Sequence, residues 1–266
     1  MSLDDALTPG VTNTSLEDLT LSSLSPGNLG VDPALEVTSS AQASSATSSV
    51  LANVLLRNSS TGANQIRSIN GTTESSRQTL PSLTGSGWKV LSSGDFNRDG
   101  QDDLLWQNSS TGATRIWQIS GSTIQSFDLL TVDSNWQVVG LADFNGDNSL
   151  DILWQNTQSQ TAAVWLLNGA QYQSSVTIGS ASSGWRVQAL GDFNSDRSTD
   201  LVWQNVNTGQ VALWLLNKTQ ISQGVWLDST SKNWEIKGVA DFNSDRSVDL
   251  FWQNEVTGET GFWFYQ

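Results

Sequence analysis

The sequence predicts an all-β fold, a β-propeller of about five blades, from its internal repetition and from the short strands in each repeat. Four segments beginning at Trp88, Trp136, Trp185 and Trp234 align with one another at intervals of 48, 49 and 49 residues. Repeats of this length indicate a propeller or an array, because each unit has apolar residues on both faces and must stack on its neighbours.

A fifth, degenerate copy precedes the four full repeats. The segment NVLLRNSSTGANQIR, from Asn53, matches DLLWQNSSTGATRIW, from Asp103, at an offset of 50 residues. This first copy lacks the aspartate-rich loop and both tryptophans. The repeats thus begin partway through one copy and end after the third strand of another, at Gln266. Such offset ends suggest that strands from the two termini share a blade and close the ring, or that a partner completes it.

Each full repeat is expected to form four short strands separated by Asn-, Gly- and Thr-rich turns. In the third copy these strands are RVQALGDF, DLVWQN, QVALWLLN and SQGVWLDS, which span residues 186–193, 200–205, 210–217 and 222–229. The repeats fill residues 51–266. Residues 1–50 are rich in Ser, Thr, Leu and Ala and contain no aromatic residue, so they are expected to form a low-complexity tail or linker.

Composition excludes several kinds of chemistry. The sequence contains no Cys and no His, which leaves no disulfide, thiol nucleophile, imidazole base or ordinary zinc site. The N-terminus lacks the basic and apolar regions of a Sec signal peptide, and no stretch is apolar enough to span a bilayer, so membrane insertion is not expected. These features do not determine the cellular compartment of the protein, so both export and a cytoplasmic location stay possible.

The formal net charge of −14 has a local origin. Four loops hold three aspartates each, and without these twelve the chain has 14 acidic and 12 basic residues. Nucleic acid is not an expected partner, because it requires a basic surface. The acidity is better explained by metal-ligand charge than by a solvated tail.

The four loops carry oxygen donors at alternate positions, as Ca²⁺ requires. Side chains are expected to bind from loop positions one, three, five and nine, and a backbone carbonyl from position seven. The ligand sets are Asp95, Asn97, Asp99, Gln101 and Asp103; Asp143, Asn145, Asp147, Ser149 and Asp151; Asp192, Asn194, Asp196, Ser198 and Asp200; and Asp241, Asn243, Asp245, Ser247 and Asp249. Carboxylate and amide oxygens favour Ca²⁺ or a similar hard ion over zinc or copper, so up to four Ca²⁺ ions are predicted.

Position six requires a sharp turn, and the four copies have Gly100, Asn148, Arg197 and Arg246 there. Gly and Asn adopt a positive φ more cheaply than Arg, so the third and fourth loops are expected to bind metal more weakly. The alternative is that the motif forms an Asx-rich turn that binds no metal.

The motif DF-N-x-D-x-x-x-D followed by an apolar strand resembles the FG-GAP (VCBS-type) calcium-binding repeat of integrin α-subunit propellers and of many bacterial surface and secreted proteins. The resemblance covers about residues 51–266. It implies a calcium-stabilised propeller and an extracellular or cell-surface location. It leaves function open, because one fold hosts adhesion modules, lectins and appendages of enzymes.

All 13 tryptophans lie in the repeats, and 12 occupy three repeated positions. Large rings bury much area at little entropic cost, so packing between blades is the favoured interpretation, and a platform for sugars is the alternative. Trp226 lies off the pattern and is the tryptophan expected to be exposed.

Three functions follow. The leading hypothesis is a non-enzymatic, calcium-stabilised module that binds proteins or mediates adhesion, such as an accessory subunit tethered by its tail. The second is a lectin with exposed Trp and Gln/Asn clusters such as Gln204 and Asn205. A glycan-active hydrolase is third, because nearly every repeated aspartate is assigned to a loop and no catalytic residue is identified.

Overall fold

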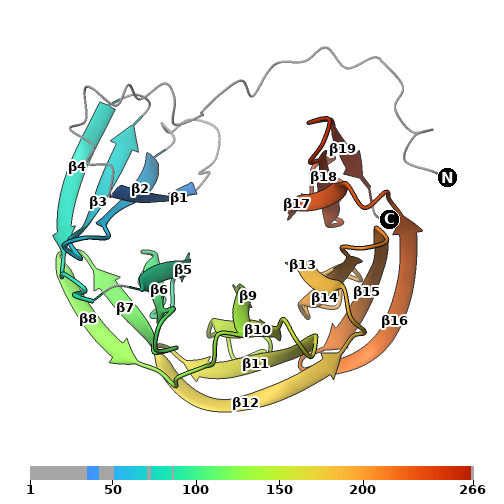
Figure 1. Cartoon of the computed structure of the whole chain (residues 1–266), viewed down its shortest axis with the longest axis horizontal. Helices are drawn as coiled ribbons and strands as arrows, with labels where there is room; N and C mark the ends of the chain where they lie inside the picture. The colour runs from blue at the N-terminus through green and yellow to red at the C-terminus, as the bar shows by residue number, and fades with distance from the viewer. Residues whose placement is uncertain (1–34, 42–50, 71–72, 86, 265–266) are drawn as a thin grey trace.

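The computed structural model describes residues 35–41, 51–70, 73–85 and 87–264. In these ranges the chain forms β-strands joined by turns and loops. Strands β1 to β19 form five antiparallel sheets around a common centre (Figure 1). The predicted all-β propeller arrangement of about five blades is confirmed. Within the described ranges no helix has the length and apolar character that crossing a membrane requires.

Each sheet follows chain order, from an inner to an outer strand. The first sheet contains β1 (Leu35–Ala41), β2 (Leu51–Asn58), β3 (Asn64–Asn70) and β4 (Thr73–Leu80). The second contains β5 (Trp88–Gly94), β6 (Asp103–Asn108), β7 (Thr114–Ser120) and β8 (Thr123–Asp128). The third contains β9 (Trp136–Ala142), β10 (Asp151–Asn156), β11 (Thr161–Asn168) and β12 (Gln171–Ser180). The fourth contains β13 (Trp185–Gly191), β14 (Asp200–Asn205), β15 (Gln210–Asn217) and β16 (Gln220–Ser229). The fifth contains β17 (Trp234–Ala240), β18 (Asp249–Asn254) and β19 (Thr260–Trp263).

The first sheet begins earlier than the repeat alignment indicates. Its inner strand β1 pairs with β2 from Leu35 opposite Asn58 to Ala41 opposite Ala52. The first copy therefore has an inner strand of its own, ahead of residue 51, and the described strands do not form the shared blade that the offset ends suggest. The rest of the predicted tail, residues 1–34 and 42–50, lies outside the described residues.

A recurring turn joins the second and third strands. In the second sheet the Asn108 side-chain oxygen accepts hydrogen bonds from the backbone N–H groups of Ser110 and Thr111, at 2.9 and 3.1 Å. Gly112 follows with a φ of 73°, and a Cβ there would lie 1.7 Å from the Val132 carbonyl oxygen. Only glycine fits this close approach, which explains the Thr-Gly pair in the sequence.

The second strand of each full repeat is the most buried. In β10 the residues DILWQ are all buried, because the strand is central in its sheet and a neighbouring sheet covers each face. In the outer strand β8, by contrast, most residues are exposed and two are half-buried. Apolar runs therefore mark the middle of each sheet, and Ser/Gln/Thr-rich runs mark its outer edge.

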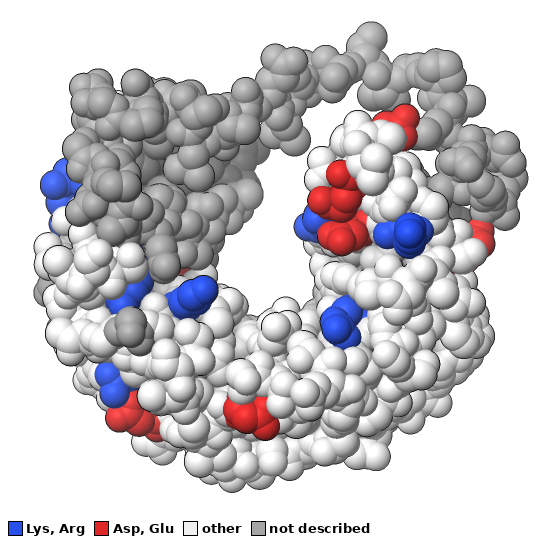
Figure 2. Space-filling model, viewed as in Figure 1, with Lys and Arg blue, Asp and Glu red and all other residues white. Residues whose placement is uncertain are grey.

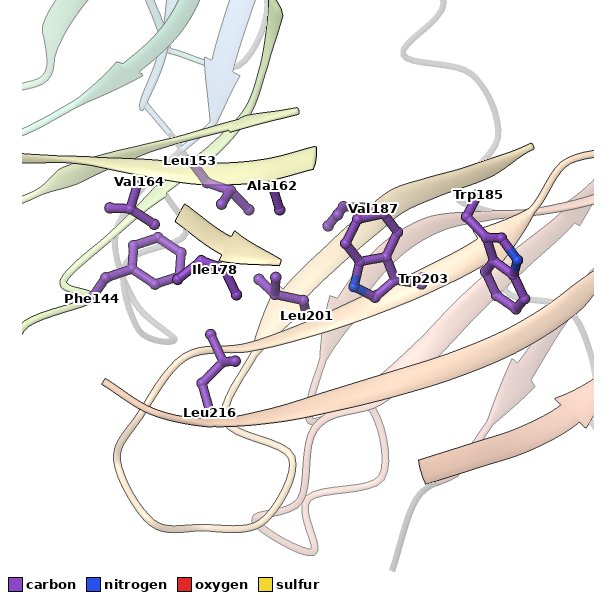
Figure 3. Close-up of a cluster of buried hydrophobic side chains, with 10 residues drawn as sticks. All are labelled: Phe144, Leu153, Ala162, Val164, Ile178, Trp185, Val187, Leu201, Trp203 and Leu216. Carbon is purple, nitrogen blue, oxygen red and sulfur yellow. The ribbon is translucent and has the colours of Figure 1, made fainter. Parts of the chain in front are cut away.

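Four clusters of buried side chains hold the five sheets together, one at each junction between consecutive sheets. Figure 3 shows the junction between the third and fourth sheets, where Leu153 and Val164 meet Val187 and Trp203. Burying one such leucine or valine contributes about 1.5–3 kcal/mol relative to leaving it exposed. Stability is therefore shared between neighbouring sheets, as in other repeat proteins.

The sheets follow an open arc, with the first and last at its two ends (Figure 1). Among the described residues no buried cluster joins the first sheet to the last. Within the described ranges, the outward face of the last sheet therefore has no neighbouring sheet, whereas every inner sheet has one on both sides.

Candidate metal-binding loops

The four predicted loops connect the first and second strands of the second to fifth sheets. Because the strands repeat in the same order, the loops occupy equivalent places in their sheets. All twenty predicted ligands lie in or directly beside these connections, and the structure separates them by loop position.

The aspartate at position nine is turned inward. Asp103, Asp151, Asp200 and Asp249 are fully buried. The two carboxylate oxygens of Asp151 accept hydrogen bonds from the backbone N–H groups of Phe144 and Leu167, both at 2.9 Å. The carboxylate thus joins the start of its loop to the third strand of its sheet.

Burial sets the acidity of these groups. It raises the pKa of Asp103 and of Asp151 to about 6, although the backbone hydrogen bonds act in the opposite direction. Desolvation also raises the pKa of Asp200. A buried carboxylate resists ionisation because its charged form loses contact with water.

Positions one, three and five lie together on the outer side of each loop. In the second loop the N–H of Asp147 donates to Asp143 Oδ1 at 3.1 Å and to Asn145 Oδ1 at 2.9 Å. The Asn145 amide in turn donates to Asp147 Oδ2 at 2.9 Å. The same pattern recurs in the first, third and fourth loops.

Hydrogen bonds stabilise the ionised form at position five. The Ser120 hydroxyl lowers the pKa of Asp99, and the backbone N–H of Ser198 lowers the pKa of Asp196. The N–H of Ser247 does the same for the pKa of Asp245. These carboxylates are therefore anionic at neutral pH, as a cation ligand must be.

Position seven carries different side chains. Gln101 Oε1 accepts a hydrogen bond from the N–H of Gly121 at 3.0 Å. Ser149 is buried, and its hydroxyl accepts a hydrogen bond from Arg98 of the preceding loop at 2.8 Å. Arg98 also donates to the Asp147 carbonyl at 3.1 Å, so the first and second loops are in direct contact.

Position six has a positive φ in all four loops, as the sequence predicts. Gly100 has a φ of 83°, Asn148 of 64°, Arg197 of 70° and Arg246 of 75°. For a long side chain this backbone region is strained. The two arginine loops hold the same conformation as the glycine loop at a higher cost.

The oxygen donors of each loop are of the type that a hard cation binds, but only some of them lie together in the structure. Positions one, three and five supply two carboxylates and an amide oxygen, whereas Ca²⁺ takes six to eight oxygen ligands. The carboxylate at position nine is engaged with backbone N–H groups instead. Across the described residues no three His, Cys, Asp or Glu side chains gather in a way that could hold a metal ion.

The repeated tryptophans pack between strands and sheets, as expected. Trp106, Trp154, Trp203 and Trp252 are at most 1% exposed, and Trp203 lies with its ring centre 4.6 Å from that of Trp214. Trp226 is 70% exposed, which confirms the prediction for the off-pattern tryptophan.

The prediction that a lectin would expose a Gln/Asn cluster at Gln204 and Asn205 is wrong for these residues. Gln204 and Asn205 are only 2% and 7% exposed. Gln204 donates to the Trp234 carbonyl of the next sheet at 2.5 Å, and Asn205 accepts the turn N–H of Asn207 at 3.0 Å. Both side chains pair backbone groups of the fold, so neither is presented at the surface to a ligand.

An exposed aromatic face on the last sheet was not predicted. Phe242, Phe262 and Phe264 are 44%, 47% and 49% exposed, and the ring centres of Phe242 and Phe262 are 5.0 Å apart. Phe251 contacts both. The repeat alignment could have indicated this face, because phenylalanine replaces the Leu, Val or Ile of the other copies at positions 251 and 262.

The view in Figure 2 shows charged side chains in small groups separated by uncharged residues. No continuous basic area is visible on the described part of this face.

Two overlapping segments, residues 95–154 and 143–203, match the family model described as the FG-GAP-like repeat. Each match begins at the first aspartate of one loop and ends within the strand after the next loop. The resemblance to FG-GAP repeats is therefore supported over residues 95–203. No curated protein matches the chain.

Solved structures with a similar course of the chain include the WD40 domain of SCAP from fission yeast, with a TM-score of 0.39 and 10% identity over 86% of this chain. A post-proline cleaving enzyme from Rickettsia typhi has a TM-score of 0.42 and 11% identity over 83% of this chain. The chain spans 63% and 33% of these two chains, respectively.

Proposed function

We propose that this chain is a non-enzymatic protein-interaction module, a scaffold of FG-GAP-like repeats stabilised by calcium at its four loops. The observation that carries the proposal is the exposed aromatic face of the last sheet, formed by Phe242, Phe251, Phe262 and Phe264. A contiguous exposed apolar patch on a folded protein marks an interaction site.

The comparison between repeats strengthens this argument. Phe242 occupies the position of Phe96, Phe144 and Phe193, which are at most 5% exposed in the inner sheets. Phe262 occupies the position of Ile116, Val164 and Leu213, which are fully buried. The last sheet therefore carries the residues of one more sheet junction, and its partner is expected to cover them with a complementary apolar surface.

Calcium enters the proposal through the exposed oxygens at loop positions one, three and five. A bound cation would offset the charge of two neighbouring carboxylates and fix the loop that leads into each second strand. In this role the metal stabilises the scaffold and takes no part in a reaction.

Affinity capture with the full chain tests the interaction. Phe262→Asp places a charge in the aromatic face, and Val256→Asp is a matched control because Val256 is 73% exposed in the turn after β18. We expect the wild-type and Val256→Asp proteins to retain the same partner and Phe262→Asp to lose it, with equal melting temperatures. Equal capture by all three proteins would contradict the assignment of this face.

A further inference from the structure

A groove of about 260 Å³ lies at the junction of the third and fourth sheets, and four of the nine residues that line it are tryptophans. Trp185, Trp203, Trp214 and Trp226 line it, and Ala212 and Gly224 leave room between them. Most of the Trp226 indole faces solvent, although its ring centre lies 5.6 Å from that of Trp185. The Trp226 ring is therefore accessible to a ligand from solvent.

The second sheet shows what occupies the equivalent place there. Arg115 pairs with Trp106 on the neighbouring strand, as Ala212 pairs with Trp203 in the fourth sheet. The Arg115 guanidinium carbon lies 5.2 Å from the centre of the Trp88 ring, and its Nε donates to Asp128 at 2.5 Å. A guanidinium over a tryptophan face is stabilised by the ring quadrupole.

A second guanidinium, from the first sheet, also lies over a tryptophan of the second sheet. The Arg57 guanidinium carbon, from the first sheet, lies 5.4 Å from the centre of the Trp106 ring. Trp88 and Trp106 are the repeat equivalents of Trp185 and Trp203. The repeat thus uses this tryptophan pair as a cation-binding surface within its own fold.

The fourth sheet keeps the tryptophans without the arginines. Ala212 stands in place of Arg115, and Gln155 in place of Arg57. Gln155 instead donates to the Trp185 carbonyl at 3.0 Å. Among the described residues no arginine or lysine lies over a ring of the fourth sheet.

Trp226 adds a further aromatic wall and brings a nearby charge. It pairs with Ala212, at the place of Asp128 in the second sheet. Asp228 lies two residues further along β16 and is exposed. The third sheet has Thr177 at the equivalent place, so it has no tryptophan there.

We propose that this groove binds a guanidinium group, presented by an arginine side chain of a partner protein. The source of the arginine rests on the proposed interaction function, whereas recognition of the guanidinium rests only on the four tryptophans. Asp228 and the net charge of −14 favour the approach of a cation. The repeat's own Arg115 supplies the model for the contact.

Titration of the full chain with the peptide N-acetyl-Gly-Arg-Gly-amide tests the proposal, with indole N–H signals followed by NMR. The matched peptide with citrulline in place of arginine keeps the shape and removes the charge. We expect saturable shifts of the Trp226 signal with the arginine peptide and at least about tenfold weaker binding of the citrulline peptide. Choline and methyl glucoside serve as probes for a quaternary ammonium and for a sugar.

Two variants place the binding in this groove. Trp226→Ala should weaken the arginine peptide at least about tenfold, monitored by the Trp185 signal. The double variant Ala212→Arg/Trp226→Asp recreates the Arg115–Asp128 pair of the second sheet, so it should fold and fill the groove from within. Val256→Ala is the control and should bind like the wild type.

Equal binding of the arginine and citrulline peptides would overturn the proposal, as would unchanged binding in Trp226→Ala. Saturable binding of methyl glucoside or choline without the arginine peptide would also overturn it. Intact arginine binding together with failed partner capture by the Phe262 face would contradict only the proposed function. Partner capture that depends on Phe262, together with no binding of the arginine peptide, would contradict only the guanidinium site.

Discussion

Gln155 on the third sheet binds the inner strand of the fourth sheet at Val187, whose backbone N–H donates to Gln155 Oε1 at 3.0 Å. The same amide donates to the Trp185 carbonyl at 3.0 Å, so one buried side chain pairs two backbone groups of the next sheet. Gln155 and Gln204, the glutamines of two WQN segments, therefore contribute to junctions between sheets rather than to a ligand site.

Gln155→Ala should destabilise the protein by about 2–4 kcal/mol, because a buried N–H and a buried C=O lose their partner. Gln253 holds the equivalent position in the last sheet, where the described residues offer no further sheet. Gln253→Ala should therefore change stability by less than about 0.5 kcal/mol. Urea unfolding of both variants measures the difference, and equal losses would contradict the bridging role.

Added calcium should raise the melting temperature of the EDTA-treated protein, because a ligand that binds only the folded state stabilises it by mass action. Asp143→Ala removes a position-one carboxylate and should reduce the calcium-induced shift, whereas the surface change Lys232→Ala should leave it intact. A melting temperature that is the same in EDTA and in excess calcium would exclude the metal. The loops would then be Asx turns held by their own hydrogen bonds.

Backbone strain at position six predicts opposite effects of two substitutions. Gly100→Ala should destabilise the protein by about 1 kcal/mol, because alanine disfavours the positive φ and no atom lies near enough to clash with its Cβ. Arg197→Gly relieves strain but frees the unfolded chain, so a net gain of up to about 1 kcal/mol is expected. Chemical denaturation in EDTA measures both, and a stabilising Gly100→Ala would contradict the argument.

Stability in metal-free buffer should depend on the raised pKa of Asp103 and of Asp151, both about 6 in the folded state. Their ordinary value is 3.8, so between these values the folded state holds more protons than the unfolded state. These two groups therefore lower the free energy of unfolding as pH rises through this window. The contribution of these two groups to the melting temperature should therefore be larger near pH 5 than near pH 7.

The double variant Asp103→Asn/Asp151→Asn provides the control, because it removes both titrating groups. Its melting temperature is expected to be lower overall, since each amide can accept only one of the two backbone hydrogen bonds. The difference between the two pH values should shrink relative to the wild type. An unchanged pH difference would show that other groups cause it.

Much of the fold was readable because periodicity reports burial directly. The third-copy strands predicted at 200–205 and 210–217 coincide with β14 and β15. The positive φ at Arg197 followed from the spacing of the loop. β1 was missed, because no tryptophan or aspartate loop marks Leu35–Ala41 as part of a repeat.

The loops show where sequence reasoning reached its limit. Spacing treats Asp143, Asp147 and Asp151 as equal oxygen donors, but the direction of a side chain depends on what packs around it. Asp151 is enclosed by its own sheet and accepts two backbone N–H groups, whereas Asp147 lies in the exposed turn. Local spacing carries no information about a hydrogen bond to Leu167, which lies sixteen residues away.

The sequence by itself determined the all-β repeat architecture, the Asn-Gly turns and the place of the four aspartate loops, because each depends on contacts within one repeat. Only the tertiary structure decided which equivalent residues differ in role. Among the described residues no further sheet packs on Phe262, which is exposed, and Trp226 faces a groove at the place where Ala212 replaces the arginine of the second sheet. Both outcomes depend on the neighbouring sheet and strand, and a repeat pattern treats all copies as the same.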